Sequence, residues 1–221
     1  MANPVSLVVG VGPGLGIAVA KRFGQAGYDV ALVSRSENEL VRLGRALEAD
    51  GITTGWAAVD ITNVESFEAA VQRFGDHAGE LSHIHFNPSV GTPCSPLELT
   101  AARLLNDVHV GVGALLTTVH AARPYLRSGA RITATGSRIA DRPWAKAASL
   151  GVQKAGLRNL VTALDTSLKD EDIRAVTVTV NGTIEEGGRF DPVHVAEAIY
   201  AASRQSAGAW QTEVVFNGKP A

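Results

Sequence analysis

The chain has 221 residues, of which 45% are hydrophobic and 19% are charged, and its formal net charge at pH 7 is −2. This near-neutral balance argues against a basic nucleic-acid-binding protein, and the apolar content argues against intrinsic disorder. The length favours one domain, which we expect to span residues 1–221. The single cysteine, Cys94, cannot form an internal disulfide, so a reducing, cytoplasmic location is expected.

The sequence shows no pattern typical of membrane insertion or export. No stretch reaches 18 consecutive apolar residues, the length that spans a bilayer. The first four residues carry no basic side chain ahead of a long apolar run, as a signal peptide would. We therefore expect a protein that associates with neither membranes nor nucleic acid.

Seven short runs, most of them apolar or β-branched, predict buried strands, and longer segments of helical periodicity lie between them. Strands that alternate with helices indicate right-handed crossovers and a parallel sheet covered on both faces. The expected fold is therefore α/β, a three-layer Rossmann-type doubly wound parallel sheet of about seven strands. The predicted strands are Val5–Val9, Val30–Val33, Thr54–Val59, Ile84–Phe86, Arg131–Thr135, Ala175–Val180 and Thr212–Phe216.

Three of the predicted helices have distinctive features. Residues 62–65 read Thr-Asn-Val-Glu, which is the pattern of a capping box that opens a helix at its threonine. The segments Leu99–Leu126 and Ala147–Leu168 each predict one long helix rich in small and apolar residues. These two segments carry more apolar residues than one face of a sheet needs.

A glycine-rich turn separates the first predicted strand from the first helix. Residues 9–16 read V-G-V-G-P-G-L-G, which places Gly10, Gly14 and Gly16 in a G-x-x-x-G-x-G spacing. Glycine lets the backbone approach a ligand closely, and the N-terminus of the next helix offers free N–H groups to a pyrophosphate. No lysine followed by serine or threonine ends the motif, so it is not a nucleoside-triphosphate loop. We expect a dinucleotide at these glycines and Leu15; a turn without ligand is the alternative.

Ser34 and Arg35, at the end of the second predicted strand, bear on the choice of dinucleotide. An NAD site usually has an acidic residue there, which binds the ribose 2′-hydroxyl. A guanidinium can instead bind a 2′-phosphate through two hydrogen bonds. NADP(H) is therefore favoured over NAD(H). The alternative is that Arg35 is a solvated cation and Ser34 caps the next helix.

With these motifs in place, the chain resembles a short-chain dehydrogenase/reductase from Val5 to Gly218. The resemblance implies an NADP(H)-dependent oxidoreductase that acts on a small molecule. It matches Ser137 to the active-site serine and Lys154 to the lysine of Tyr-x-x-x-Lys, which also holds the nicotinamide ribose. The further cofactor residues that it implies are Asp60 at the adenine, the adjacent Ile61, Asn87 in Asn-Pro-Ser after the fourth strand, and Gly182 after the sixth.

The chain departs from this family at the proton donor. The tyrosine position, four residues before Lys154 and 13 after Ser137, is Leu150, which cannot transfer a proton. The family's helix asparagine aligns with His109, and an imidazole of ordinary pKa near 6.5 suits proton transfer at neutral pH. We therefore take Ser137, Lys154 and His109 as catalytic candidates. The alternative for His109 is a structural histidine that is hydrogen-bonded within its helix.

Other polar residues are weaker candidates. Cys94 should border the substrate side, but no motif activates it, and Trp144 either lines the pocket or packs. Ser149 lies about 100° around its helix from Leu150. His83 and His85 alternate on the fourth strand and share a face, yet no acidic or cysteine companion stands at ligand spacing, so no metal site is expected.

The segment after the sixth strand is also unusual. Only seven residues separate Thr183 from Asp191, where the family commonly has a longer lid, so residues 183–191 should form a short flap over an open or partner-completed site. The resemblance further suggests that the two long helices pair in a homodimer or homotetramer.

Three functional hypotheses remain open at this point. The first is the oxidoreductase with a modified proton path. The second is a sensor that binds NADP(H) without consuming it, and the third is a non-redox enzyme that uses the same cleft. The sequence names no substrate and does not establish that hydride transfer occurs.

Overall fold

All seven predicted strands are present, each within two residues of its expected ends. The computed structural model describes residues 3–219, so the terminal pairs of the predicted 1–221 domain lie outside the described residues. The strands pair in parallel in the order β3-β2-β1-β4-β5-β6-β7, as a doubly wound fold requires. Their bounds are β1 Val5–Val9, β2 Asp29–Ser34, β3 Thr54–Ala58, β4 His83–Phe86, β5 Arg131–Ser137, β6 Arg174–Val180 and β7 Glu213–Phe216.

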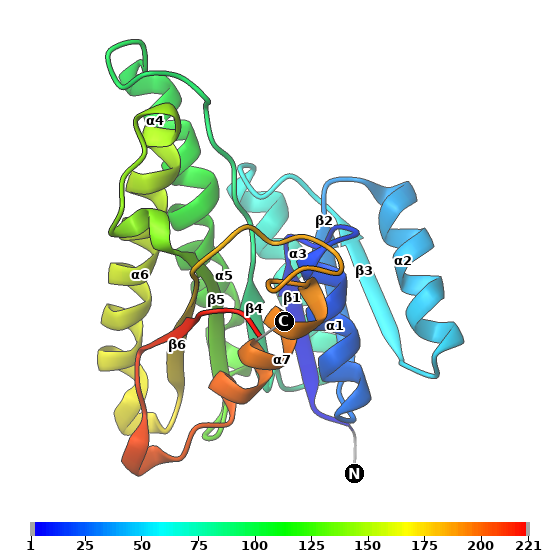
Figure 1. The fold of residues 1–221 in the computed structure, drawn as a ribbon. Helices are drawn as coiled ribbons and strands as arrows, with labels where there is room; N and C mark the ends of the chain where they lie inside the picture. The colour runs from blue at the N-terminus through cyan, green and yellow to red at the C-terminus, as the bar shows by residue number, and fades with distance from the viewer. Residues whose placement is uncertain (1–2, 220–221) are drawn as a thin grey trace.

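Helices cover both faces of this sheet, which confirms the three-layer prediction (Figure 1). Alternate residues of each strand face opposite cores, so that Leu7 and Val9 of β1 belong to one apolar cluster and Val8 to the other. The cluster around Val8 includes residues of α1 (Leu15–Gln25), α2 (Glu37–Ala49) and α7 (Pro192–Ser203). The other core is formed against α3 (Val64–Ala78), α5 (Ala114–Ala122) and α6 (Ala148–Leu168).

The prediction of one continuous helix over Leu99–Leu126 is wrong. The observed helix begins at Ala101 as α4 (Ala101–Val108), passes through a π-helical turn at His109–Gly113 and resumes as α5. The side chain of Gln153, from α6, causes the interruption, because its Nε2 donates to the carbonyl oxygen of Asp107 at 2.7 Å. A side chain that takes a carbonyl from the helical ladder opens it locally, and such π turns often lie at functional sites.

Gly111 allows this close approach between α6 and the π turn. A Cβ atom at Gly111 would lie 2.0 Å from Cδ of Gln153, so any other residue there would displace the Gln153 side chain. The helix α4 and the loop before it rise beyond the carboxyl ends of the strands (Figure 1). The π turn therefore lies at the edge where the site forms.

The predicted capping box at Thr62 is also wrong. Asn63 caps α3, with its Oδ1 accepting from the amide of Ser66 at 3.2 Å. The amide and hydroxyl of Thr62 instead donate to the carboxylate of Asp60, at 2.9 and 2.8 Å. This local turn competes with helix capping, so the helix begins one residue later than the box predicts.

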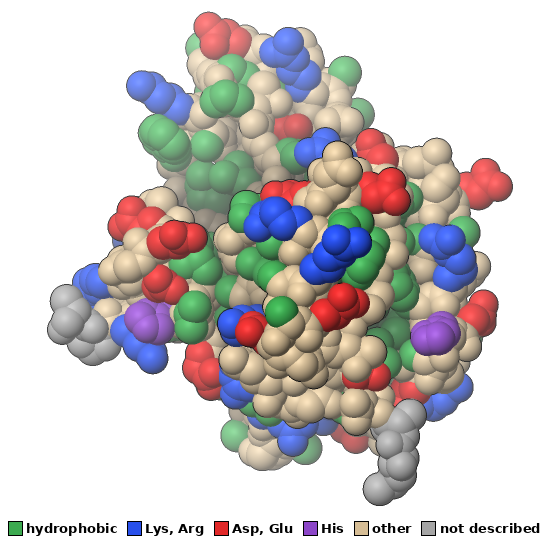
Figure 2. Space-filling view, turned by 90° about the vertical axis from the view of Figure 1, so that its right-hand side faces the viewer, with side chains coloured by type: hydrophobic (Ala, Val, Ile, Leu, Met, Phe, Trp, Pro, Cys, Tyr) green, Lys and Arg blue, Asp and Glu red, His purple; other side chains and the backbone are tan. Residues whose placement is uncertain are grey.

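The outer surface carries charges of both signs. Figure 2 shows lysine and arginine side chains intermixed with aspartate and glutamate on the face nearest α2. Among residues 3–219, no helix combines the length and the apolar character needed to cross a membrane.

Candidate functional site

The carboxyl ends of the strands open into one cavity of about 720 Å³. Residues that follow β1, β2, β3, β4, β5 and β6 line it, together with residues of α4 and α6. The cavity brings together all the residues that the sequence assigned to the cofactor: Gly10, Gly14, Leu15, Gly16, Ser34, Arg35, Asp60, Ile61, Asn87, Lys154 and Gly182.

The glycine turn after β1 is shaped by contacts that exclude side chains. Gly10 has a φ of +85°, and a Cβ there would lie 2.8 Å from the nitrogen of Pro88. A Cβ at Gly16 would lie 2.7 Å from the carbonyl oxygen of Gly10, so α1 can pack directly on the turn. At Gly12 and Gly14 a Cβ would meet nothing within 4 Å, because these residues border open space.

The N-terminus of α1 faces this open space without a side-chain cap. The first N–H groups of a helix have no intrahelical partners, and together they carry a partial positive charge. The turn and the helix therefore form a site suited to a phosphate group.

Ser34 and Arg35 line the cavity at the end of β2. Ser36, not Ser34, caps α2, with its Oγ accepting from the amide of Glu39 at 3.3 Å, so the helix-cap alternative for Ser34 is wrong. Arg35 is exposed, and among the described residues no carboxylate lies within ion-pair distance of it. Its guanidinium is thus available to an anionic ligand.

Asp60 stands on the same rim, in an ionised state. Two hydrogen bonds from Thr62 lower the pKa of this carboxyl, and the charges of Arg35 and His109 lower it further. Asp60 can therefore accept hydrogen bonds at neutral pH, as the adenine contact implied by the family resemblance requires.

Lys154 of α6 is the buried cation of the cavity. Its Nζ donates to the carbonyl oxygen of Thr135 at 2.9 Å, and its side chain is almost completely buried. Burial disfavours the charged form and lowers the pKa of Lys154 to about 8. Ser137, at the end of β5, lines the same cavity, and its Oγ accepts from the amide of Ile139.

Leu150 lies where the sequence predicts the family's tyrosine, on the wall of the cavity that also holds Ser137 and Lys154. Among the described residues, no tyrosine lines this cavity. Tyr28 and Tyr200 pack edge-on against Phe23, and Tyr125 donates to Asp76. The cavity therefore has an apolar side chain at the position where the family resemblance implies a proton donor.

His109 is not among the residues that line the cavity. It lies in the π turn, packs its Cδ2 near Gly113, and is close enough to Asp60 to influence that carboxyl. Asn106 and Val110, four residues apart on adjoining turns, line the cavity in its place. Asn106 is not among the residues predicted from the sequence; its position three residues before His109, on the same side of a helix, was the available signal.

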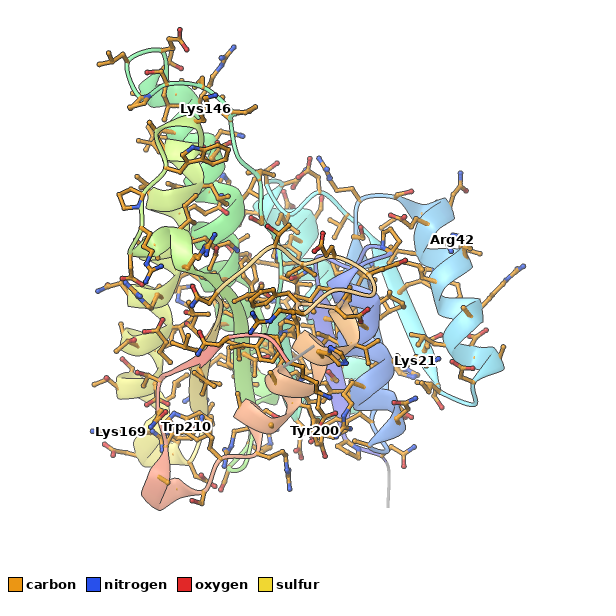
Figure 3. The ribbon with its side chains drawn as sticks, in the orientation of Figure 1. Lys21, Arg42, Lys146, Lys169, Tyr200 and Trp210 are labelled. Atoms are coloured by element: carbon orange, nitrogen blue, oxygen red, sulfur yellow. The ribbon has the colours of Figure 1, made fainter. Side chains whose placement is uncertain are left out.

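A second cavity of about 650 Å³ adjoins the first at Ser89, Val90 and Leu150. Cys94, Trp144 and Lys146 line it, and Trp144 is 60% exposed. Figure 3 shows Lys146 at the upper end of the molecule, far from Trp210 at the lower end. The second cavity therefore lies at the carboxyl ends of the strands and has room for a small molecule.

Hydrogen bonds hold the loop that forms this second cavity. The amide of Thr92 donates to the carboxylate of Asp107 at 2.9 Å and to Oγ of Ser149 at 3.0 Å. Ser149 is buried and lines neither cavity, in agreement with its predicted position away from Leu150. This serine supports the loop and does not face the site.

The segment between β6 and α7 is short and contains no helix over residues 181–191. Gly182 and Ile184 line the first cavity from this segment. The ring of Phe190 covers Gly182 and packs edge-on against Phe216 of β7. The segment is therefore tied to the edge of the sheet at its far end.

Comparisons with known proteins agree with this architecture. Residues 4–185 match the model of the short chain dehydrogenase family. The chain belongs to the short-chain dehydrogenase family. By family it is therefore an oxidoreductase with a nucleotide-binding fold.

Among curated relatives, dehydrogenase/reductase SDR family member 4 of Oryctolagus cuniculus is 27% identical over 178 residues, which cover 79% of this chain and 68% of the relative. An uncharacterized oxidoreductase of Mycobacterium tuberculosis is 30% identical over 174 residues, covering 74% of this chain and 64% of the relative. The chain thus matches about two thirds of the length of these relatives.

Solved structures show the same fold. A metagenomic short-chain oxidoreductase in complex with NADP superposes with a TM-score of 0.88 at 21% identity, covering 98% of both chains. An alcohol dehydrogenase from Thermococcus sibiricus, complexed with 5-hydroxy-NADP, superposes with a TM-score of 0.83 at 20% identity and covers 96% of this chain and 95% of that one.

Proposed function

We propose that the protein is an NADP(H)-dependent oxidoreductase whose proton path differs from the usual one of its family. One observation carries the proposal: the glycine turn, Arg35, Ser137 and Lys154 line a single cavity in which Leu150 stands at the tyrosine position. The two NADP-type complexes among the structural neighbours support the choice of cofactor class.

The residues present fit this dinucleotide. The uncapped N-terminus of α1 and the open space at Gly12 and Gly14 suit the pyrophosphate, and Arg35 suits a 2′-phosphate. The Lys154 ammonium has no carboxylate partner within ion-pair distance among the described residues, which suits it to ribose hydroxyl groups. When bound, the cofactor supplies the hydride.

The proton for a substrate carbonyl comes, in this proposal, from Lys154. Reduction adds a hydride at carbon and a proton at oxygen, and Leu150 has no proton to give. The Lys154 ammonium, with its pKa lowered to about 8, is a stronger acid than an ordinary lysine and is mostly protonated at pH 7. Ser137 holds the carbonyl oxygen by donating its hydroxyl hydrogen. The neutral amine then takes up a proton from solvent.

His109 remains a prediction as a proton donor, but its position outside the cavity does not support that role. The substrate is a small molecule that approaches from the second cavity, which meets the first at Leu150.

An assembly through the long helices is also part of the proposal. Leu105, Leu116 and Val152 are exposed on α4, α5 and α6, where pairing of two copies would cover them.

The test is to mix purified protein with NADPH and a panel of ketones, imines and enones and to follow cofactor absorbance. We expect slow turnover that falls as pH rises through about 8, because the ammonium of Lys154 is then lost. Calorimetry on the same protein measures NADPH and NADH affinities. If neither nucleotide binds, the proposal is overturned.

Leu150 favours a second candidate function, that of a sensor that binds NADP(H) without consuming it. A sensor needs the intact nucleotide half of the cavity and no proton donor, as this apolar wall suggests. It would be stabilised against thermal unfolding by NADPH through mass action, with no consumption of cofactor on any substrate of the panel.

A further inference from the structure

A line of polar side chains runs through the core between the sheet and helices α1 and α7. It lies on the face that also buries Val8 and Val178. The phenyl ring of Phe23 from α1 stacks on the imidazole of His83, with ring centroids 3.8 Å apart, and Tyr200 of α7, which is labelled in Figure 3, packs edge-on against Phe23. The members are all buried and come from β1, β4 and β5: Ser6, His83, His85, Thr133 and Thr135.

Hydrogen bonds join these side chains in sequence to the floor of the cavity. Such a continuous series within an apolar layer is costly unless every member is satisfied. The contacts run from Ser6 Oγ to His83 Nδ1 (2.8 Å), His83 Nε2 to Thr133 Oγ1 (3.0 Å), Thr133 Oγ1 to His85 Nδ1 (2.8 Å), His85 Nε2 to Thr135 Oγ1 (3.2 Å), Thr135 Oγ1 to Asn87 Oδ1 (2.8 Å) and Asn87 Nδ2 to the Gly10 carbonyl oxygen (3.0 Å).

The direction of these bonds follows from counting hydrogens, starting at the cavity. The Gly10 carbonyl only accepts, so the amide nitrogen of Asn87 faces it and the amide oxygen faces Thr135. A threonine hydroxyl has one hydrogen, which Thr135 gives to Asn87. Thr135 must therefore accept an N–H from Nε2 of His85.

The same count continues to the other end of the series. A neutral imidazole has one N–H, so Nδ1 of His85 accepts from the hydroxyl of Thr133. Thr133 in turn accepts from Nε2–H of His83, whose Nδ1 accepts from Ser6. A 3.4 Å contact from Thr133 to the Ile84 carbonyl competes for the hydroxyl hydrogen. If Thr133 gave its hydrogen to that carbonyl, both Nδ1 and Nε2 of His85 would have to donate, but a neutral imidazole carries only one N–H.

Both imidazoles are neutral, as this count requires. Burial lowers the pKa of His83 well below its usual range, and the neighbouring His85 lowers it further. Burial lowers the pKa of His85 to about 3, with a smaller contribution from the charge of Lys154. Each bond in the series therefore points toward the cavity.

We propose that His83 and His85 are positioning residues of the cofactor site, held as Nε2–H tautomers so that their one-way hydrogen bonds orient Asn87 and Thr135. Asn87 holds the carbonyl of Gly10 in the phosphate turn. Thr135 uses its hydroxyl for the series and its carbonyl for Nζ of Lys154 at 2.9 Å. The series thus supports both ends of the cofactor cavity. The part of the inference that concerns cofactor affinity rests on the proposed function.

The first experiment measures the tautomers directly, by nitrogen-15 NMR of histidine-labelled protein without ligand. We expect both buried histidines to carry hydrogen on Nε2 only and to show no titration between pH 8 and pH 5. Exposed His120 of α5 provides a solvent-accessible imidazole in the same spectrum for comparison. An Nδ1–H tautomer at either position, or a transition near pH 6.5, would overturn the proposal. This measurement does not depend on cofactor binding.

The second experiment compares NADPH affinity among folded variants. His85→Leu removes a donor and an acceptor together, and we expect about tenfold weaker binding. His85→Gln keeps one group of each kind and should recover most of the affinity, while the control His120→Leu should change nothing. Wild-type affinity in His85→Leu would contradict the positioning role. Failure of the wild type to bind either nucleotide would overturn the proposed function, while the tautomers would still stand.

If His85→Leu does not fold, Thr135→Val serves the same purpose. It keeps the shape of the side chain and the carbonyl that Lys154 uses, but removes the hydroxyl from the series. We expect a loss of NADPH affinity similar to that of His85→Leu. An unchanged affinity would show that the series does not act on the site.

Discussion

The two ends of the cavity differ in how much they depend on individual side chains. The end near α1 presents a glycine turn and an uncapped helix N-terminus, both of which offer backbone groups to a ligand. The end near α6 depends on Ser137, Leu150 and Lys154, each through one side chain. One substitution can remove a proton donor and leave the phosphate site intact, because backbone N–H groups do not change with sequence.

The largest expected effect is at Lys154. Replacing it with methionine removes the proposed proton source but keeps an unbranched chain of similar length in a buried position. We expect turnover to fall by about 10²–10⁴, the usual contribution of a positioned acid. Steady-state kinetics measures the change, with Lys169→Met, an exposed lysine at the opposite end of the molecule (Figure 3), as the matched control. Unchanged turnover would contradict the proposed proton path.

Restoring the family's tyrosine should have the opposite effect. In Leu150→Tyr a phenol would stand on the wall beside Lys154, whose positive charge would favour its ionised form. We expect carbonyl reduction to increase by about 10² or more. The exposed Val152 on the same helix provides the control variant Val152→Tyr. Absence of any gain would show that the apolar wall is not what limits this end.

At the opposite end, Arg35→Asp tests the choice of dinucleotide. A carboxylate would repel a 2′-phosphate and could accept from a ribose 2′-hydroxyl, so NADPH affinity should fall by about 10- to 100-fold while NADH affinity rises. Titration calorimetry measures both. Arg42 on α2, which lies outside the cavity (Figure 3), provides the control Arg42→Asp. Equal losses for both nucleotides would argue against a 2′-phosphate site.

A further expected effect is a dependence of stability on pH. Burial lowers the pKa of Lys154 from 10.5 to about 8, so burying its charged form costs stability below pH 8. Between about pH 8 and 10.5 the unfolded chain binds the extra proton, and stability therefore rises with pH. Denaturant unfolding should show that the advantage of Lys154→Met over wild type shrinks across this range. A constant difference would mean that Lys154 is not desolvated.

Local patterns in the sequence were enough for the strands and for the nucleotide end of the site. Each strand is a short apolar or β-branched run, and burial on both faces of a parallel sheet requires that composition wherever the run occurs. The turn at Gly10, Gly14 and Gly16 is similarly local, because positive φ and close backbone approach require glycine. The family resemblance, counted from Ser137 and Lys154, places Leu150 at the tyrosine position, and Leu150 lines the cavity with both residues.

Contacts between segments distant in sequence decided the rest. Gln153 of α6 opens the helix that precedes His109, and this π turn leaves Asn106 and not His109 on the cavity wall. The hydrogen-bonded series through His83 and His85 also depends on the parallel register of β1, β4 and β5, which aligns Ser6 with His83 and His85 with Thr133. Periodicity in one strand showed that the two histidines share a face, but only the paired strands supply their partners.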